Sequence, residues 1–162
     1  MEARLAYNVP LLRRAAFAFW KRSIGMYLPL AVIVMLAAIT SQIANGDRSW
    51  IVGVEGAVLL MTLAFMVALY FVHYRNALAK LRAMGGRAEA RFVADDETFT
   101  LESAIGRSTF AWSSIKEVWC FPAFWLLLFS KAQFATIPLE CVPLEMQAHV
   151  LDRIRSAGGK IA

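Results

Sequence analysis

The sequence predicts an α+β membrane protein in which a two-helix transmembrane hairpin is followed by a small antiparallel β domain with a C-terminal helix. Two apolar stretches, residues 24–44 and 51–72, are joined by a short turn, and no charged residue occurs from 23 to 46 or from 56 to 72. Each stretch approaches the roughly 20 apolar residues with which a helix crosses the ~30 Å hydrocarbon layer of a bilayer. Beyond them, polar and apolar residues alternate with a period near two, which is typical of half-buried strands.

A chain of 162 residues, of which 59% are hydrophobic, has room for the hairpin and one small domain. We divide it into a cytoplasmic N-terminal segment, 1–22, the hairpin, 23–74, a helical linker, 75–87, and a cytoplasmic β domain with its terminal helix, 88–162. The alternative is a buried hairpin of a soluble protein, but soluble core helices are rarely apolar on all sides over this length. A cleaved signal peptide has an apolar region of only about 7 to 15 residues, so we expect the first stretch to be retained.

Two elements are expected before the first span. Residues 4–7 indicate a short strand that would cover an unpaired edge of the β domain. Pro10 then opens an apolar and basic helix over residues 11–22, because Pro fits the first helical position. This helix either lies on the membrane or extends the first span, and the sequence leaves both interpretations open.

Basic residues predict the orientation of the hairpin, because short loops rich in Lys and Arg stay in the cytoplasm. The turn between the spans contains only Arg48, so both termini are expected on the cytoplasmic side. The basic residues on that side are also candidate contacts for anionic lipid headgroups. They are Arg13, Arg14, Lys21, Arg22, Arg75, Lys80 and Arg82, with Arg87 following. The simpler interpretation is that these charges only set the topology.

Residues near the ends of the spans fit the same orientation. Aromatic residues are expected at the two headgroup levels, and they are Trp20, Tyr27, Trp50, Tyr70 and Tyr74. Glu55 is the single acidic residue close to a span, and a carboxylate inside a membrane is a candidate for ion or proton handling. We favour an interfacial position, because Glu55 follows Trp50 by only about one and a half helical turns. Small residues spaced by four, such as Gly53 and Ala57, would allow close packing within the hairpin or in a dimer.

After the second span, a helix is expected to continue to Met84 and to stop at Gly85-Gly86. Three alternating segments then predict strands, and they are 89–93, 98–102 and 108–112. We interpret Asp95-Asp96-Glu97 as a turn between two strands, although paired carboxylates also bind cations or act as acid and base. Residues 105–107 mark the next turn.

Residues 118–129 are almost wholly apolar, yet the segment is too short to span a membrane. We interpret it as two buried strands around a turn at Pro122-Ala123; the alternative is an aromatic segment that dips into the inner leaflet. Its aromatic residues are expected to fill a small core, and they are Trp119, Phe121, Trp125 and Phe129. A strand at 134–138 and a helix from Pro143 to Gly158-Gly159 follow. The apolar stripe expected on that helix is Leu144, Ala148, Leu151 and Ile154.

The sequence contains no catalytic or cofactor-binding pattern. Cys120 and Cys141 have neither C-x-x-C spacing nor a neighbouring His, and a structural disulfide is unusual in the cytoplasm, so we interpret them as small apolar residues. His73 and His149 are expected far apart, one at the inner interface and one on the terminal helix. The glycine pairs lack the preceding strand and following helix of a nucleotide-binding loop. We therefore expect no enzymatic activity, no cofactor and no metal.

The order of features over residues 89–157 carries a family resemblance. They are the strand-turn-strand segment 92–99, the run 112–118, the apolar strand 125–129, and Ile137-Pro138 ahead of a terminal helix. Following two spans, these features resemble the YcxB-like family of bacterial membrane proteins. The resemblance implies a cytoplasmic domain similar to bacterial pleckstrin-homology-like (PH-like) folds, a bent antiparallel sheet with a C-terminal helix packed on it. It supplies no catalytic residues.

Together, these observations predict a membrane-anchored, non-catalytic binding or scaffold module at the inner leaflet of the plasma membrane. The alternative is an accessory subunit of a membrane transporter or enzyme complex. The expected partners are the lipid bilayer, anionic headgroups, and a protein or a second copy of the chain. The net charge of +5 does not indicate nucleic-acid binding, because the basic residues concentrate beside the hairpin.

Overall fold

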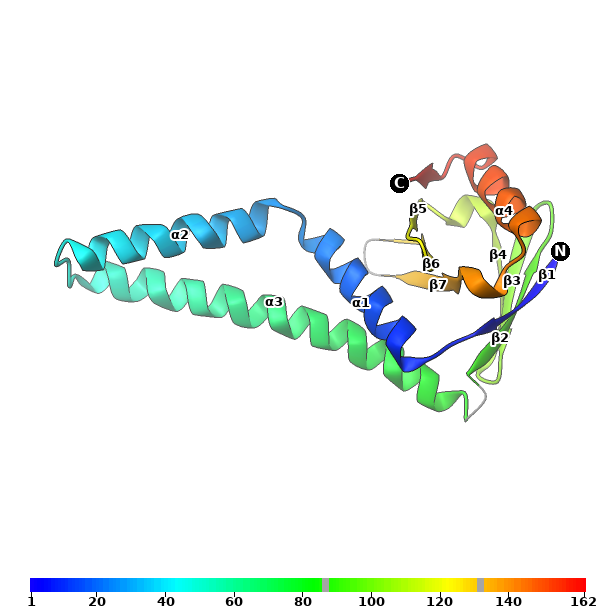
Figure 1. Cartoon of the computed structure of the whole chain (residues 1–162), viewed down its shortest axis with the longest axis horizontal. Coiled ribbons are helices and arrows are strands. Elements are labelled where there is room, and N and C mark those ends of the chain that lie inside the picture. The colour runs from blue at the N-terminus through cyan, green and yellow to red at the C-terminus, as the bar shows by residue number, and fades with distance from the viewer. Residues whose placement is uncertain (86–87, 131–132) are drawn as a thin grey trace. The chain divides into compact units, whose positions relative to one another are not determined.

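The computed structural model describes residues 1–85, 88–130 and 133–162, and it divides into two compact units. The helical unit contains residues 16–75. The β unit combines residues 1–15 with residues 76–162. The β unit is therefore assembled from two parts of the chain that flank the helical unit in the sequence (Figure 1).

Three helices account for residues 9–83, namely α1 (Val9–Ile24), α2 (Tyr27–Ala44) and α3 (Trp50–Ala83). Gly25, between α1 and α2, has a φ of 69°, a left-handed conformation that glycine adopts without the cost of a Cβ. The break means that α1 does not extend the first span, so this alternative for residues 11–22 is wrong. The first candidate span, α2, begins at Tyr27, three residues later than expected from the apolar pattern.

The turn between α2 and α3 is short and locally hydrogen-bonded. Gly46 has a φ of 81°, and the backbone N–H of Ser49 donates to Asp47 Oδ1 at 2.8 Å. Next to the turn, Gln42 Nε2 on α2 donates to Glu55 Oε2 on α3 at 3.0 Å. The carboxylate of Glu55 thus has a polar partner on the facing helix close to the turn.

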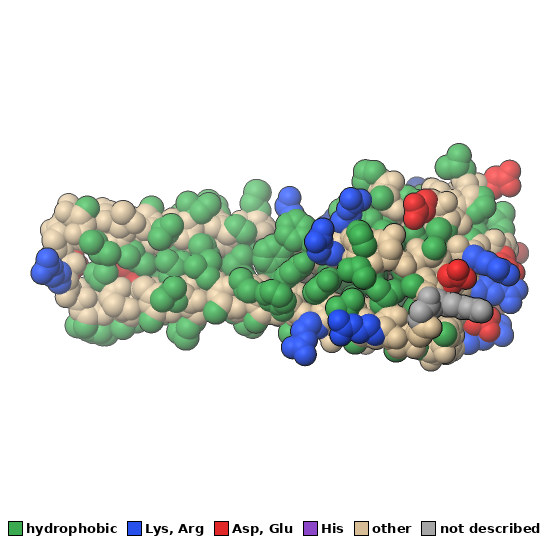
Figure 2. Space-filling view, turned by 60° about the horizontal axis from the view of Figure 1, so that its bottom comes forward, with side chains coloured by type: hydrophobic (Ala, Val, Ile, Leu, Met, Phe, Trp, Pro, Cys, Tyr) green, Lys and Arg blue, Asp and Glu red, His purple; other side chains and the backbone are tan. Residues whose placement is uncertain are grey.

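Both α2 and α3 are long and apolar enough to cross a membrane, and each has a single buried residue, Ile39 and Leu59 respectively. Figure 2 shows mostly apolar and uncharged side chains along these helices on the face in view. At 34 residues, α3 exceeds the roughly 20 residues of one span, so it continues past the apolar stretch as expected. It ends before Gly85, which has a φ of 62°. The expected helix stop at Gly86 and the basic residue Arg87 lie outside the described residues.

The first sheet of the β unit has the antiparallel order β1-β2-β3-β4. Its strands are β1 (Glu2–Ala6), β2 (Glu89–Ala94), β3 (Thr98–Ser103) and β4 (Gly106–Ala111). The expected N-terminal edge strand is confirmed, although it begins at Glu2, and Leu5 on this strand lies opposite Ala90 and is fully buried. The turn between β2 and β3 is the predicted acidic run.

The second sheet has the order β7-β6-β5-β8. Its strands are β5 (Glu117–Cys120), β6 (Phe124–Leu128), β7 (Phe134–Pro138) and β8 (Lys160–Ile161). Phe121 N donates to Phe124 O at 3.0 Å, which closes the predicted turn at Pro122-Ala123. All five residues of β6 are buried, which favours the core interpretation over an aromatic segment in the leaflet. The short strand β8 pairs in parallel with β5 and was not predicted.

Two sequence expectations near β4 are wrong by a residue or more. The turn before β4 is Ala104-Ile105, because Gly106 and Arg107 already pair with Ser103 and Glu102. Trp112 does not end the strand; it begins a short 3₁₀ helix, η1 (Trp112–Ser114). The buried indole Nε1 donates to Asp95 O at 2.9 Å, a tertiary bond that alternation alone cannot reveal.

One hydrophobic core joins both sheets to α4 (Leu144–Ser156). The expected stripe on this helix is partly wrong, since Leu144 is 80% exposed and Ala148 is exposed, whereas Ile154 is fully buried. The buried residues of α4 are spaced by four and are Met146, Val150 and Ile154. Trp125 and Phe129 contact this core as predicted and Trp119 is buried, while Phe121, at the tight turn, is only half-buried.

Candidate membrane interface

An aromatic cluster joins α1 to α3 inside the helical unit. Its members are Phe17 and Trp20 on α1 and Tyr70 and Tyr74 on α3. Trp20 lies 5.6 Å from Phe17 and 6.1 Å from Tyr70 between ring centroids, and Tyr74 stacks on Tyr70 at 6.1 Å. Trp20 Nε1 also donates to Met66 O at 2.8 Å, which satisfies the indole N–H. Trp and Tyr, which combine an apolar ring with a polar end, are enriched where apolar and aqueous layers meet.

The same two helices make a second contact, with a shorter distance between ring centroids. Phe19 on α1 is 1% exposed, and its ring centroid lies 4.9 Å from that of His73 on α3. Half-buried His73 therefore has a packing role in the helical unit. His149 lies on α4 in the β unit, so the structure keeps the two histidines in separate units, in agreement with the sequence analysis.

The seven candidate lipid-contacting residues are all exposed, and they are Arg13, Arg14, Lys21, Arg22, Arg75, Lys80 and Arg82. Lys21, Arg22 and Arg75 belong to the helical unit and directly follow members of the aromatic cluster in the sequence. The other four belong to the β unit, on α1 and on the last turns of α3. Long basic side chains can keep their apolar stems along apolar surface while their charges stay in water.

Sequence reasoning identified Trp20, Tyr70 and Tyr74 as separate headgroup-level residues and missed that they form one cluster. It also left out Phe17. The available signal was spacing, since Phe17 and Trp20 are three residues apart and Tyr70 and Tyr74 are four apart, so each pair shares one helix face. Which two faces would meet was not readable from periodicity, because α3 is apolar nearly all round.

Tyr7 and Cys141 of the β unit are engaged in structural contacts. Tyr7 is partly buried against the hydrophobic core, its hydroxyl donates to Thr136 O at 2.9 Å, and burial raises its pKa above the ordinary value. Cys141 Sγ accepts from Ala6 N at 3.4 Å, and Cys120 and Cys141 form no disulfide. Within residues 1–85, 88–130 and 133–162, no three His, Cys, Asp or Glu side chains are grouped to hold a metal ion.

The fold and this interface define a class: an α+β protein with two long apolar helices and a small domain of two sheets closed by a terminal helix. Residues 94–150, from the end of β2 into α4, match the family described as YcxB-like protein. The β unit therefore contains a YcxB-like domain, as the resemblance predicted. No curated protein and no solved structure matches the chain. The helical unit and β1 lie outside the matched residues.

Proposed function

We propose that this chain is a membrane-anchored, non-catalytic binding module whose YcxB-like domain acts at the inner leaflet of the plasma membrane. The carrying observation is the exposed apolar surface of α2 and α3, since only 6% of the apolar window in each helix is buried. A core helix of a soluble protein buries most of such a surface, and large exposed apolar patches mark membrane or protein contacts. Both helices satisfy their own backbone hydrogen bonds, as a lipid environment requires.

The aromatic cluster and the basic residues support the orientation. Positive charge concentrates beside the start of α2 and at the end of α3, away from the turn that connects them. Lys and Arg at these positions favour the cytoplasmic side of a membrane. Each Lys or Arg near an anionic surface contributes about 1 kcal/mol of attraction. In this arrangement Trp20 and Tyr70 occupy the headgroup layer, and the seven basic residues contact anionic headgroups. The domain is held at the membrane by covalent connection through both α1 and α3.

The PH-like assignment belongs to the same proposal. It is supported by two four-stranded sheets that share one core and by a C-terminal helix that supplies Val150 and Ile154 to that core. An arrangement of this kind provides a rigid scaffold with exposed edges and loops, and binding sites are commonly carried on such loops.

Site-specific labelling tests anchoring and orientation together. In a Cys120→Ala, Cys141→Ala background, Ser49→Cys should react with a membrane-impermeant maleimide added to intact cells, whereas Lys160→Cys should react only after lysis. The chain should also remain in the membrane pellet after carbonate extraction. Labelling of Lys160→Cys in intact cells would reverse the orientation, and release by carbonate would refute the anchor.

Headgroup contact is tested by counting anionic lipids retained on the purified chain by native mass spectrometry. We expect Arg13→Gln combined with Arg14→Gln to retain fewer phosphatidylglycerol molecules than the wild type. The matched control, Arg107→Gln combined with Arg155→Gln, removes two exposed charges from β4 and α4 and should retain the wild-type number. An unchanged number of retained lipids in the Arg13, Arg14 variant would mean that these two residues only set topology, and equal losses in both variants would mean that net charge, and not these two positions, retains the lipid.

A further inference from the structure

The strand β4 leaves one edge of the first sheet open. It pairs with β3, and among the described residues no strand pairs with its other side. Five of its six residues are exposed and Phe110 is half-buried. Edge strands are usually protected from pairing with other chains by Pro, several charges, a bulge or a covering segment. β4 contains no Pro, and Arg107 is its one charged residue. By contrast, the strand at the opposite edge, β1, is held by two hydrogen bonds at its end, in which the Tyr7 hydroxyl donates to Thr136 O and Ala6 N donates to Cys141 Sγ.

The hydrogen bonds of the β3–β4 ladder identify which backbone groups face the open side. Trp112 N donates to Glu97 O at 3.3 Å, so these two residues form a hydrogen-bonded pair directly after Thr98 and Ala111, the last pair of the ladder. Because hydrogen-bonded and non-hydrogen-bonded pairs alternate in antiparallel sheets, Phe110 and Ser108 bond toward β3. Arg107 and Thr109 therefore present both their N–H and their C=O outward. Ala111 presents its N–H outward, while its C=O accepts from Ser114 Oγ at 2.6 Å.

Aromatic side chains lie beside this edge. The ring centroid of Phe110 is 4.9 Å from that of Phe129 and 5.4 Å from that of Phe99. Phe110 and Phe129 are only partly buried, whereas Phe99 is fully buried beneath them. A strand added along β4 would thus meet an apolar surface on one face, and alternate residues of that strand would contact it.

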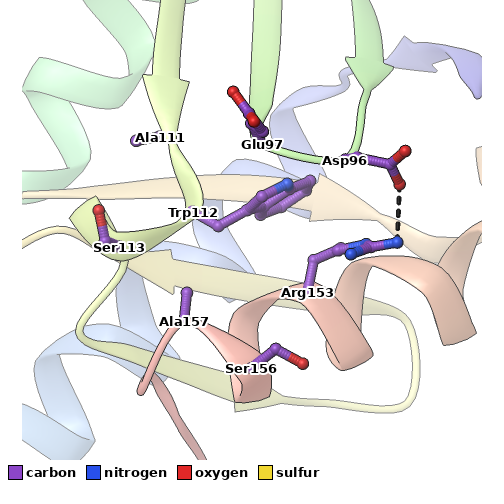
Figure 3. A pocket seen from close by; sticks show the side chains of 8 residues that line it. All are labelled: Asp96, Glu97, Ala111, Trp112, Ser113, Arg153, Ser156 and Ala157. Atoms are coloured by element: carbon purple, nitrogen blue, oxygen red, sulfur yellow. Dashed lines mark ion pairs between the residues drawn. The ribbon is translucent and has the colours of Figure 1, made fainter.

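A pocket of about 320 Å³ adjoins the end of β4 at Ala111, Trp112 and Ser113. The remaining lining residues are Asp96, Glu97, Arg153, Ser156 and Ala157. Figure 3 shows Arg153 and Asp96 paired on one side of the Trp112 ring, with Ser113 on the other side.

The pocket carries a negative balance on a chain whose net charge is +5. Arg153 Nη2 lies 2.7 Å from Asp96 Oδ1, so the one cation among the lining residues is already paired with a carboxylate. Glu97 is then left uncompensated. Ser156 and Ala157 add the C-terminal end of α4, which carries the negative end of the helix dipole. The pocket is therefore suited to an ammonium or guanidinium group.

We propose that the β4 edge and this pocket together bind an extended peptide segment of a protein partner, with a Lys or Arg side chain in the pocket. The segment adds a strand to β4 through Arg107, Thr109 and the N–H of Ala111. Its inward-facing apolar side chains cover Phe110 and Phe129. This inference rests on the proposed binding role and names the surface and the partner chemistry.

Fluorescein-labelled heptapeptides of sequence Ser-Val-Thr-Val-Thr-Lys-Ser, and matched peptides with Glu or norleucine in place of Lys, test the proposal. The full chain is held in nanodiscs of phosphatidylcholine, which is zwitterionic and does not attract the lysine peptide. Fluorescence anisotropy should show the Lys peptide binding roughly tenfold more tightly than the Glu peptide. Failure of all three peptides to bind, or equal binding of all three, would overturn the proposal.

Two variants and a modified ligand separate the pocket from the edge. Glu97→Lys should remove the preference for the Lys peptide, while Glu89→Lys, the same charge change on β2, should leave it within about twofold. Thr109→Pro removes an outward N–H without breaking the ladder to β3 and should abolish binding. Peptides N-methylated at alternate positions test the same bonds without altering the protein, and one of the two registers should lose binding. Binding that survives Thr109→Pro and both N-methylated registers would overturn the strand-addition model.

A second copy of the chain is the competing occupant of this edge. Nanodiscs loaded with two copies that crosslink through β4, with crosslinking abolished by Thr109→Pro and no peptide binding, would overturn the peptide proposal in favour of self-association. Membrane anchoring is measured separately by carbonate extraction and cysteine labelling. A chain that is anchored as proposed but binds no peptide would refute this inference alone.

Discussion

The hairpin and the β domain use the same apolar residue types in opposite ways. In α3, 34 residues include a single buried one, whereas all five residues of β6 are buried. Leu36 on α2 is 54% exposed, and Leu127 on β6 is 0% exposed. Apolar composition therefore does not tell whether a segment is covered by its own chain or by another medium. The domain is stabilised by complementary packing, whereas the two apolar helices expose most of their side chains and satisfy their backbone hydrogen bonds within each helix.

The largest expected effect comes from removing β1, which precedes the hairpin in the sequence, whereas the other strands of its sheet follow the hairpin. A fragment of residues 88–162 lacks β1, and loss of Leu5 alone is expected to cost about 2–5 kcal/mol in so small a core. We expect the fragment to lose cooperative thermal unfolding by circular dichroism and to regain it when residues 2–9 are fused ahead of it. The same fusion with Leu5→Asp is the control and should not restore folding. A monomeric, cooperatively folded fragment with no gain from the strand would contradict this prediction.

Next in size is a matched pair of phenylalanines. Phe99→Ala removes a fully buried ring that contacts Trp112 at 4.9 Å between ring centroids, and should destabilise the domain by about 3–5 kcal/mol. Phe65 on α3 is 61% exposed, so Phe65→Ala should leave domain unfolding unchanged. Urea unfolding of the full chain in nanodiscs, followed by limited proteolysis, measures both. Equal losses of stability would remove the distinction between packed and surface-exposed apolar residues.

A newly introduced positive charge is expected to impair membrane insertion when it lies in the hairpin and not when it lies on the domain surface. Leu36→Arg places a cation near the middle of α2, where membrane insertion is expected to cost roughly 3 kcal/mol. Ile105→Arg, at a residue of the domain that is 49% exposed, should have no effect on insertion. The fraction of chain that resists carbonate extraction measures the difference. If Leu36→Arg remained fully inserted, α2 would not cross the hydrocarbon centre.

Glycine positions give a smaller contrast. A Cβ at Gly159 would lie 2.6 Å from Ile154 Cγ2 and 3.1 Å from Ile115 O, so Gly159→Ala should destabilise the domain by about 1–3 kcal/mol. A Cβ at Gly53 on α3 would meet no side chain within 4 Å, and Gly53 has no positive φ, so Gly53→Ala should be neutral or slightly stabilising. Thermal melting of the two variants checks the sign of each effect. Gly159→Ala with an unchanged melting temperature would mean that β8 is not closely packed.

The smallest expected effect is a pH dependence confined to the domain. Burial raises the pKa of Tyr7, whereas tyrosine in an unfolded chain has a pKa of about 10. Below that pH the hydroxyl is protonated in both states; above it the unfolded state loses its proton first, so the free energy of unfolding falls as pH rises. Tyr7→Phe should remove this alkaline component, and Tyr27→Phe, at an 87% exposed residue, should keep it. Identical alkaline slopes of unfolding free energy in the wild type and Tyr7→Phe would contradict the assignment.

Most elements of the fold were predictable, and the failures have a common cause. The short strand at the N-terminus, the acidic turn and the terminal helix followed from local pattern. The strand β8 did not, because two residues carry no periodicity and its hydrogen bonds depend on β5. The face of α4 was misread at Leu144 and Ala148, since several residue sets on a short helix have helical spacing and only the core selects one. The seven basic residues were found to be exposed, but their contact with lipid stays a prediction.

The sequence by itself determined that two apolar helices precede a small β domain, because length, charge distribution and periodicity are local properties of the chain. It also indicated the YcxB-like domain. Only the tertiary structure decided that Phe17, Trp20, Tyr70 and Tyr74 form one cluster, that β4 has an open edge, and that Trp112 and Arg153 share a pocket with Asp96. Trp20 and Tyr70 are 50 positions apart and Asp96 and Arg153 are 57 apart. Such pairings are selected by the packing of whole faces and edges, which no local pattern encodes.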